Sequence, residues 1–209
     1  RYMVRVDREK AAELLLEAEA ELTSGTGAEL TFETDEELAA ASRARDAIQG
    51  DIELIHAVRE FNDFPAMCRR YEKARSLLRG RSNLVSERMF WTFNSPHSAF
   101  LYLREPGGYR TLLRTAKEHL GAFDELSGGA NAGAFDLLLA EYLLETGDGA
   151  GAVPHLRKGE YKARRGLQYR GLSAAAFLKA RLHPAEGRPE KAAAPLDDVN
   201  EDLNATDHP

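Results

Sequence analysis

The 209-residue sequence has almost no cysteine, the residue that forms disulfide bonds and many metal clusters. Cys68 is its only cysteine, which excludes an intrachain disulfide and a cysteine-based metal cluster. We expect the Cys68 thiol to be buried and inert rather than reactive. Apolar runs are short, as at residues 137–140, and fall far below the roughly 20 residues that a membrane-spanning helix needs. We therefore expect no segment that crosses a membrane.

The sequence also lacks the signals of export. No signal peptide opens it, which together with the single cysteine favours a cytoplasmic location. Arg1 stands where a start methionine would stand, and residues 204–209 complete no helix, so we expect the chain to be a piece of a larger protein. No stretch alternates polar and apolar residues with the period of a strand.

The sequence lacks the residue patterns that are typical of nucleic-acid, metal and nucleotide binding. The formal net charge of −6 argues against a nucleic-acid clamp, because affinity for phosphates depends on lysine and arginine. The six histidines never stand four apart on one helix, and no phosphate-binding Gly-x-x-x-x-Gly-Lys-Ser/Thr loop occurs. We therefore expect no metal site, no bound cofactor and no catalytic residue in this chain.

What the sequence does contain is a repeated helical hairpin. Gly147 is predicted to end a helix in the left-handed conformation, and Asp148 is placed to cap the next helix. Gly187 repeats this junction 40 residues later, and residues 62–63 are a weaker echo. We predict an all-α fold of tetratricopeptide-like helical hairpins, stacked in a right-handed superhelix, as a single repeat region over residues 1–209. The clearest apolar stripe, just before the first junction, consists of Phe135, Leu138, Leu139, Tyr142 and Leu143.

Capping signals predict the helices of the first part of the chain. Thr34 and Glu37 form a capping box that opens a helix over about residues 35–49. Gly50 is either a turn or a continuation, and a further helix begins at about residue 51 and ends near Asn62.

The second part is predicted in the same way. Asp63 caps a helix that runs to about residue 78, an irregular loop follows over 79–95, and Ser95 and Pro96 open a short helix. The helices of the 109–126 region and of the hairpin come next. The helix after Asp148 is expected to begin a turn late, because Gly151 and Pro154 weaken its start.

A basic run stands in this otherwise acidic chain. It either attracts an anion or acidic partner, or forms the solvated outer face of one helix, and the spread of its positions favours the outer face. The run consists of Arg157, Lys158, Lys162, Arg164, Arg165 and Arg170.

Aromatic and polar side chains gather in the irregular region. Trp91, Phe93, His97 and Tyr102 are our candidate ligand or partner surface, because such a cluster at a crossover favours a concave pocket. The alternative is that the loop folds these aromatic rings onto the helical core.

Four segments carry a resemblance to a known family. They are residues 50–63 (GDIELIHAVREFND), 91–96 (WTFNSP), 101–107 (LYLREPG) and 140–148 (AEYLLETGD). Together they resemble the central helical-repeat region of bacterial LuxR-type, MalT-like ATP-dependent transcriptional regulators.

The resemblance implies a regulatory sensor module. In such a regulator, a signal ligand or partner bound by the repeats controls self-association and transcription activation. ATP and DNA are bound by flanking modules whose motifs these residues do not include, so no enzyme activity is expected of this chain itself. The second hypothesis is a protein-interaction scaffold with no small-molecule ligand.

Overall fold

The computed structural model describes residues 8–24, 34–60, 63–86 and 106–204. Those residues form eight α-helices and one short 3-10 helix and contain no strand, which confirms the all-α expectation. No helix in these ranges is both long and apolar enough to cross a membrane. The chain divides into two compact units, Arg1–Val85 and Ser86–Pro209. The assignment of the whole chain to a single repeat region stays a prediction.

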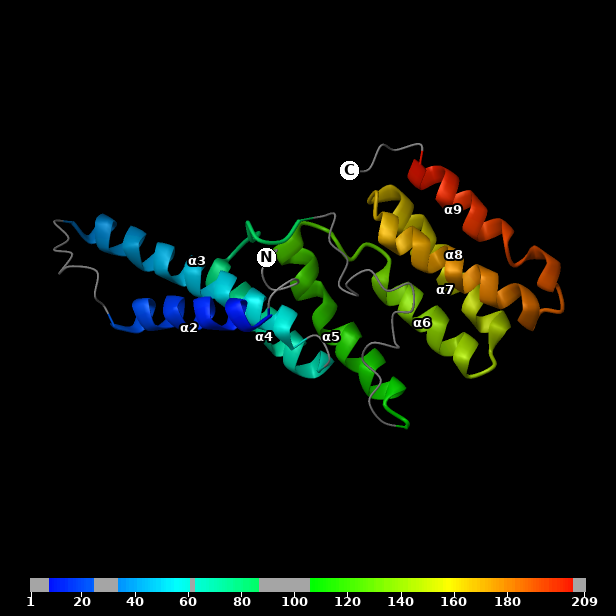
Figure 1. Cartoon of the computed structure of the whole chain (residues 1–209), viewed down its shortest axis with the longest axis horizontal. Helices are drawn as coiled ribbons and strands as arrows, with labels where there is room; N and C mark the ends of the chain where they lie inside the picture. The colour runs from blue at the N-terminus through cyan, green and yellow to red at the C-terminus, as the bar shows by residue number, and fades with distance from the viewer. Residues whose placement is uncertain (1–7, 25–33, 61–62, 87–105, 205–209) are drawn as a thin grey trace. The chain divides into compact units, whose positions relative to one another are not determined.

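The first unit contains three described helices, α2 (Arg8–Ser24), α3 (Asp35–Arg59) and α4 (Phe64–Leu78) (Figure 1). α2 and α4 both pack on α3, and α4 returns antiparallel to it. The capping box that opens α3 is confirmed, since the Thr34 hydroxyl accepts from the Glu37 N–H and the Glu37 carboxylate accepts from the Thr34 N–H.

The helix break considered at Gly50 does not occur, and α3 is continuous from Asp35 to Arg59. Gly50 is buried where α3 meets α4. A Cβ atom at Gly50 would lie 2.6 Å from the Leu78 side chain and 3.3 Å from the Ala74 carbonyl oxygen. The glycine therefore permits the two helices to approach closely instead of ending one of them.

The start of α4 follows the prediction, because the Asp63 carboxylate accepts a hydrogen bond from the Ala66 N–H at 2.9 Å. Cys68 on this helix is buried, as expected. Burial raises the pKa of the Cys68 thiol to about 12, so the thiol stays protonated at neutral pH. The predicted left-handed cap at Asn62 and the predicted short helix after Ser95 lie outside the described residues.

The second unit is a succession of helices in which neighbours along the chain pack together (Figure 1). Three of them, α6, α7 and α8, share one core. The helices are α5 (Tyr109–Ser127), α6 (Ala134–Glu145), α7 (Gly149–Arg165), α8 (Tyr169–Ala185), η1 (Pro189–Lys191) and α9 (Ala194–Asn204). The shared core consists of Leu137, Ala140, Ala152, Leu156, Ala174, Ala175, Leu178 and Leu182.

The hairpin junction between α6 and α7 is confirmed. Gly147 has a φ of 86° and the Asp148 carboxylate accepts from the Gly151 N–H. The expected late start of α7 is wrong, because the Asp148 cap satisfies a free donor of the first turn and α7 begins at Gly149. Pro154 is accommodated inside this helix, where it removes only one backbone donor.

The junction recurs 40 residues later in its backbone hydrogen bonds. The N–H groups of residues 146, 147 and 148 donate to the carbonyls of 142, 144 and 143, and those of 186, 187 and 188 donate to 182, 184 and 183. Gly187 also repeats the left-handed conformation, with a φ of 75°. The second junction differs downstream, because Arg188 makes no side-chain cap. The 3-10 helix η1 follows it, and α9 begins only at Ala194.

Burial of α6 is broader than its predicted apolar stripe. Leu137, Leu138 and Ala140 are buried, and so are the carboxylate residues Asp136 and Glu141. The other stripe residues, such as Tyr142, are half-buried. α6 contacts α5, α7 and α8, so several faces of the helix are covered at once.

The start of α6 approaches α7 through two glycines, which gives a test of this packing. A Cβ atom on Gly133 would lie 2.3 Å from the Gly159 carbonyl oxygen, and the φ of Gly133 is 89°. We expect Gly133→Ala to lower the free energy of unfolding by about 2–4 kcal/mol, because it adds left-handed strain to a backbone collision. Urea unfolding followed by circular dichroism measures the change.

The matched control is Gly121→Ala on α5, where a new Cβ atom meets nothing within 4 Å and the φ is not positive. This variant should be neutral or stabilise the fold by up to about 1 kcal/mol. Equal stability of the two variants would show that α6 and α7 do not approach at Gly133.

Candidate functional site

The candidate surface of Trp91, Phe93, His97 and Tyr102 lies outside the described residues, so it stays a prediction. Polar chemistry in the described part gathers in three places. Two are buried carboxylates held by cations, one in each unit, and the third is an open cavity in the second unit.

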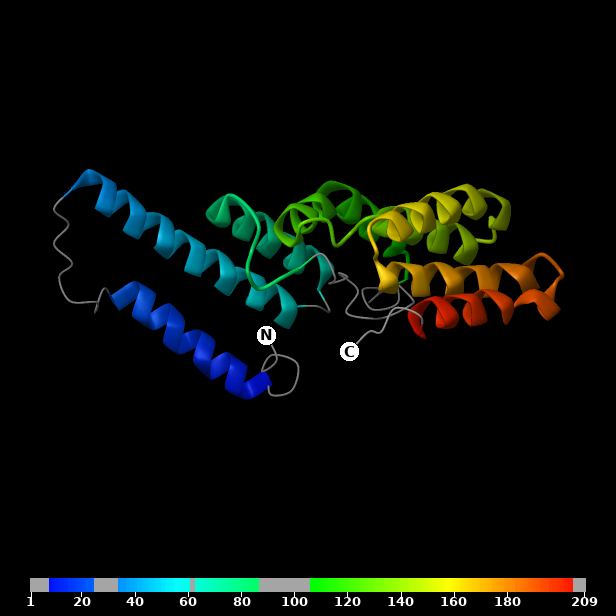
Figure 2. The same cartoon turned by 90° about the horizontal axis from the view of Figure 1, so that it is seen from above.

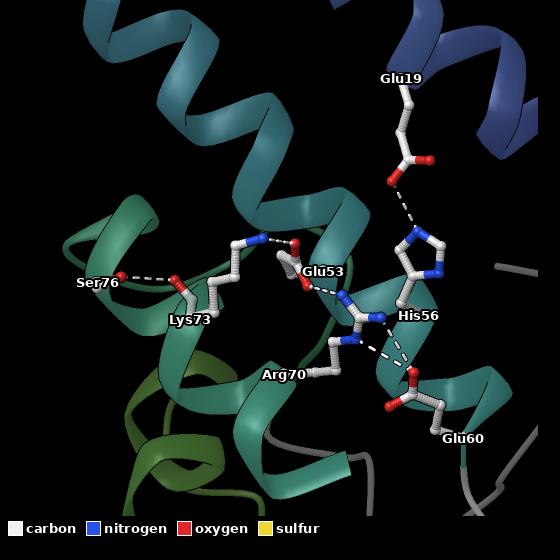
Figure 3. Close-up of polar contacts among 7 residues, drawn as sticks. All are labelled: Glu19, Glu53, His56, Glu60, Arg70, Lys73 and Ser76. Carbon is white, nitrogen blue, oxygen red and sulfur yellow. Dashed lines mark hydrogen bonds and ion pairs between the residues drawn. The ribbon is translucent and has the colours of Figure 1, made fainter. Parts of the chain in front are cut away.

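The buried carboxylate of the first unit is Glu53 on α3 (Figure 3). Arg70 of α4 donates to one of its oxygens at 2.7 Å, and Lys73 pairs with the other. Arg70 also pairs with Glu60, the C-cap residue of α3, at 3.1 Å, so one guanidinium joins α4 both to α3 and to its C-terminal cap. Burial alone would raise the pKa of Glu53, but the hydrogen bonds from Lys73 and Arg70 outweigh it and hold that pKa below the ordinary 4.5.

Both oxygens of Glu53 are engaged by side chains of the neighbouring helix, so the cluster joins helices. A separate contact, His56 Nε2 to the Glu19 carboxylate at 2.9 Å, links α3 to α2 (Figure 3). We interpret both as structural contacts of the first unit.

In the second unit, the buried carboxylate that is paired with cations of the next helix is Asp136, in the first turn of α6. Its side chain is 6% exposed and pairs with Lys162 at 2.6 Å and with Lys158 at 3.1 Å, both on α7. Burial alone would raise the pKa of Asp136, but the hydrogen bonds from Lys162 and Lys158 outweigh it and hold that pKa below the ordinary 3.8.

The basic run is therefore divided among different neighbours. Lys158 and Lys162 serve the buried Asp136, whereas the Arg165 guanidinium lies 5.9 Å from the centre of the Tyr161 ring. Arg157 lines the cavity instead. The run forms neither a single anion-binding stripe nor a purely solvated face.

The open cavity has a volume of about 500 Å³ and is framed by α7, α8, η1 and α9. We call it the α7–α9 cavity. α8 and α9 lie side by side there (Figures 1 and 2). The cavity is lined by Val153, Leu156, Arg157, Lys179, Leu182, His183, Glu186, Arg188, Lys191, Ala194, Pro195 and Asp198.

The apolar part of this lining is continuous with the core of the second unit. Leu156 and Leu182 belong to that core, and Val153 packs against it. Ala194 and Pro195 add an apolar side from the start of α9. The cavity therefore offers apolar contact on both α7 and α9.

The polar part of the lining is basic, although the chain as a whole is acidic with a net charge of −6. It contains four cations, Arg157, Lys179, Arg188 and Lys191, and two carboxylates, Glu186 and Asp198. This local reversal of charge would favour an anion over a cation at the cavity.

Ion pairs neutralise two of these cations. Lys179 contacts Glu160 at 2.6 Å, and Arg188 pairs with Glu186. For Arg157 there is no ion pair or hydrogen bond within the part of the chain that the structure describes.

The same holds, among the described residues, for Lys191 and for the carboxylate of Asp198. His183 adds a buried Nδ1 that has no hydrogen-bond partner in the described ranges, since the nearest carboxylate oxygen, on Glu186, lies 3.8 Å away. Buried polar atoms are normally hydrogen-bonded, so the His183 Nδ1 is a group of this lining to which a ligand could hydrogen-bond.

The sequence signalled only part of this site. Arg157 stands in the basic run and shares α7 with Val153 and Leu156, but the remaining lining residues come from α8, η1, α9 and the turn between α8 and η1. Their common signal is the repeat around Gly187, which places the second hairpin beside the first. In the described ranges, no group of three or more His, Cys, Asp or Glu side chains is arranged to hold a metal ion.

Asp136 provides a test of the electrostatics of this unit. We expect Asp136→Asn to lower the free energy of unfolding at pH 7 by about 1–3 kcal/mol, because it removes the charged acceptor of two lysines. The pKa of Asp136 is lowered on folding, so its stabilisation is present above about pH 4 and is lost as pH falls through the lower pKa of the folded state.

The difference between wild type and variant should therefore shrink toward zero in strong acid. Urea titrations between neutral pH and about pH 2 measure it. Glu118→Gln, at an exposed carboxylate on α5, is the control and should change stability by less than about 0.5 kcal/mol. A difference between wild type and Asp136→Asn that does not depend on pH would contradict the ion-pair assignment.

Comparison with known proteins adds no assignment. No family model, curated protein or solved structure matches the chain.

Proposed function

We propose that this chain is a regulatory helical-repeat module that binds a signal ligand in the α7–α9 cavity. The observation that carries this proposal is the cavity itself, with about 500 Å³ of space and a lining that combines apolar side chains with more cations than carboxylates. Small-molecule sites in proteins commonly have this volume and this mixture of apolar lining with a few polar groups. The role agrees with the sensor region that the resemblance to LuxR-type, MalT-like regulators implies.

The proposed architecture is a set of tetratricopeptide-like hairpins in a right-handed superhelix. Its support is the recurrence, 40 residues apart, of the hydrogen-bond pattern and left-handed glycine at Gly147 and Gly187. In such stacks each hairpin contacts only its neighbours, so a ligand between two hairpins acts directly on their interface.

α9 is the proposed moving part. None of its side chains that the structure describes is buried, and the helix on which it packs is α8. A helix with so little buried surface opens at low free-energy cost. A ligand that contacts α7 and α9 together favours the state in which α9 is docked, which is the differential affinity that a switch requires.

In the complete regulator, this docking would control self-association and transcription activation in the cytoplasm. ATP and DNA would be bound by modules other than these residues. The chain's own contribution is recognition, and the proposal assigns it no catalytic step.

A second candidate is a protein-interaction scaffold. The observation that favours it is in the first unit, where Leu14, Leu16, Leu38 and Ile48 are 44–64% exposed on α2 and α3. Large apolar side chains exposed on neighbouring helices are available for contact with another protein.

A thermal-shift screen against a metabolite panel tests the first proposal, because a ligand of the folded state raises the apparent melting temperature. The variant Ala194→Trp is designed to fill the cavity from the start of α9. Ala150→Trp is the matched control, exposed in the first turn of α7 but outside the lining. Compounds that bind the cavity should raise the melting temperature of the wild type and of Ala150→Trp, and should not raise that of Ala194→Trp.

Hydrogen exchange measured with a stabilising compound should show slower exchange in α9 peptides. Equal stabilisation of Ala194→Trp would place the ligand elsewhere on the chain. A panel without any stabilising compound, combined with a protein partner whose binding Leu16→Ser and Leu38→Ser abolish, would favour the scaffold.

A further inference from the structure

We propose that the ligand of the α7–α9 cavity is an amphipathic organic monoanion, a compound with one carboxylate and an apolar body. This inference rests on the proposed function and names the chemical class that the same site selects. It follows from the balance of unpaired charge, from the type of cation present and from the extent of the apolar lining.

The charge balance indicates a single negative charge. Once Lys179 is paired with Glu160 and Arg188 with Glu186, the lining retains three charged groups without an ion-pair partner among the described residues: the cations of Arg157 and Lys191 and the carboxylate of Asp198. These three side chains sum to one positive charge. A monoanion compensates that charge, whereas a phosphate dianion would bring a second charge into a lining that already holds two carboxylates.

The type of cation favours a carboxylate. The Arg157 guanidinium is planar and presents paired N–H donors that match the two oxygens of a carboxylate. Lys191, from η1, adds an ammonium group to the lining of the same cavity. One headgroup bound by both would connect α7 to the segment that leads into α9.

The apolar side chains of the lining favour a ligand that carries an apolar group in addition to its carboxylate. Val153, Leu156, Leu182, Ala194 and Pro195 line the cavity, and its volume of about 500 Å³ greatly exceeds that of a small inorganic ion. Burial of an apolar body against these side chains supplies affinity that the partly solvated charges do not. Acetate or chloride alone would leave this part of the cavity in contact with water.

The test uses three probes that share one apolar body: 4-phenylbutyrate, 4-phenylbutanol and 4-phenylbutylamine. We expect 4-phenylbutyrate to bind at least about tenfold more tightly than the neutral alcohol, and the amine to bind most weakly. Acetate, which has the headgroup without the body, should not bind measurably. Chemical-shift titrations of isotopically labelled protein measure each dissociation constant and show whether α7 and α9 respond.

Two substitutions locate the headgroup. Arg157→Gln and Lys191→Gln are both at exposed positions and should keep the helical circular dichroism spectrum. Each should raise the dissociation constant of 4-phenylbutyrate by about tenfold and leave that of 4-phenylbutanol unchanged. Arg114→Gln, at an exposed arginine of α5 outside the lining, is the matched control and should change neither dissociation constant.

The possible failures are distinguishable. Equal binding of acid and alcohol, with no effect of Arg157→Gln, would overturn the monoanion while leaving the proposed sensor cavity intact. Tighter binding of the amine, or binding of an oligoglutamate peptide with none of 4-phenylbutyrate, would also overturn the monoanion. Failure of the proposed function itself is read separately, from equal stabilisation of Ala194→Trp in the metabolite panel.

Discussion

The second unit depends on how closely α6 and α7 approach. The backbone of Gly133 lies so near Gly159 that a single added carbon atom would meet a carbonyl oxygen at 2.3 Å. This approach places the small side chains of Ala140 and Ala152 in one core with α8. Interiors are packed as densely as organic crystals, so separation of this pair would displace the surface on which α8 lies. The shape of the cavity depends on the same packing, because Leu156 and Leu182 belong both to the core and to the lining of the cavity.

Each unit also buries a carboxylate that receives two cations from the neighbouring helix. Glu53 forms ion pairs with Arg70 and Lys73. Asp136 forms ion pairs with Lys158 and Lys162. In both cases the paired cations outweigh desolvation, and the carboxyl pKa is lowered. An isolated buried charge would be strongly destabilising, so the pairing is a condition of the burial. Such pairs add more to the specificity of helix pairing than to net stability, because desolvation cancels much of the attraction.

The features predictable from sequence are those that neighbouring residues determine. The caps at Thr34, Asp63 and Asp148 and the left-handed Gly147 and Gly187 depend on side chains within a few residues, and all are present. Gly50 was ambiguous because its role depends on Leu78, a residue of another helix. Asp136 was invisible as a buried residue for the same reason, since its lysines lie on α7. Arg157 stood in a basic run, but only the tertiary fold separates it from Lys158.

The cavity arises where the repeat departs from its own pattern. In the first hairpin, the Asp148 carboxylate accepts from the Gly151 N–H, and α7 starts at once. At the equivalent place in the second hairpin stands Arg188, which cannot accept a hydrogen bond, and the Lys191 N–H donates instead to the Arg188 carbonyl at 3.1 Å. The backbone there forms the 3-10 turn η1, and α9 starts later than α7 does. Arg188, which stands in place of the capping aspartate, lines the cavity, and Lys191 lines it from the 3-10 turn. The place where the repeat loses its local helix signal is therefore also the place that contributes two of the four cations of the lining.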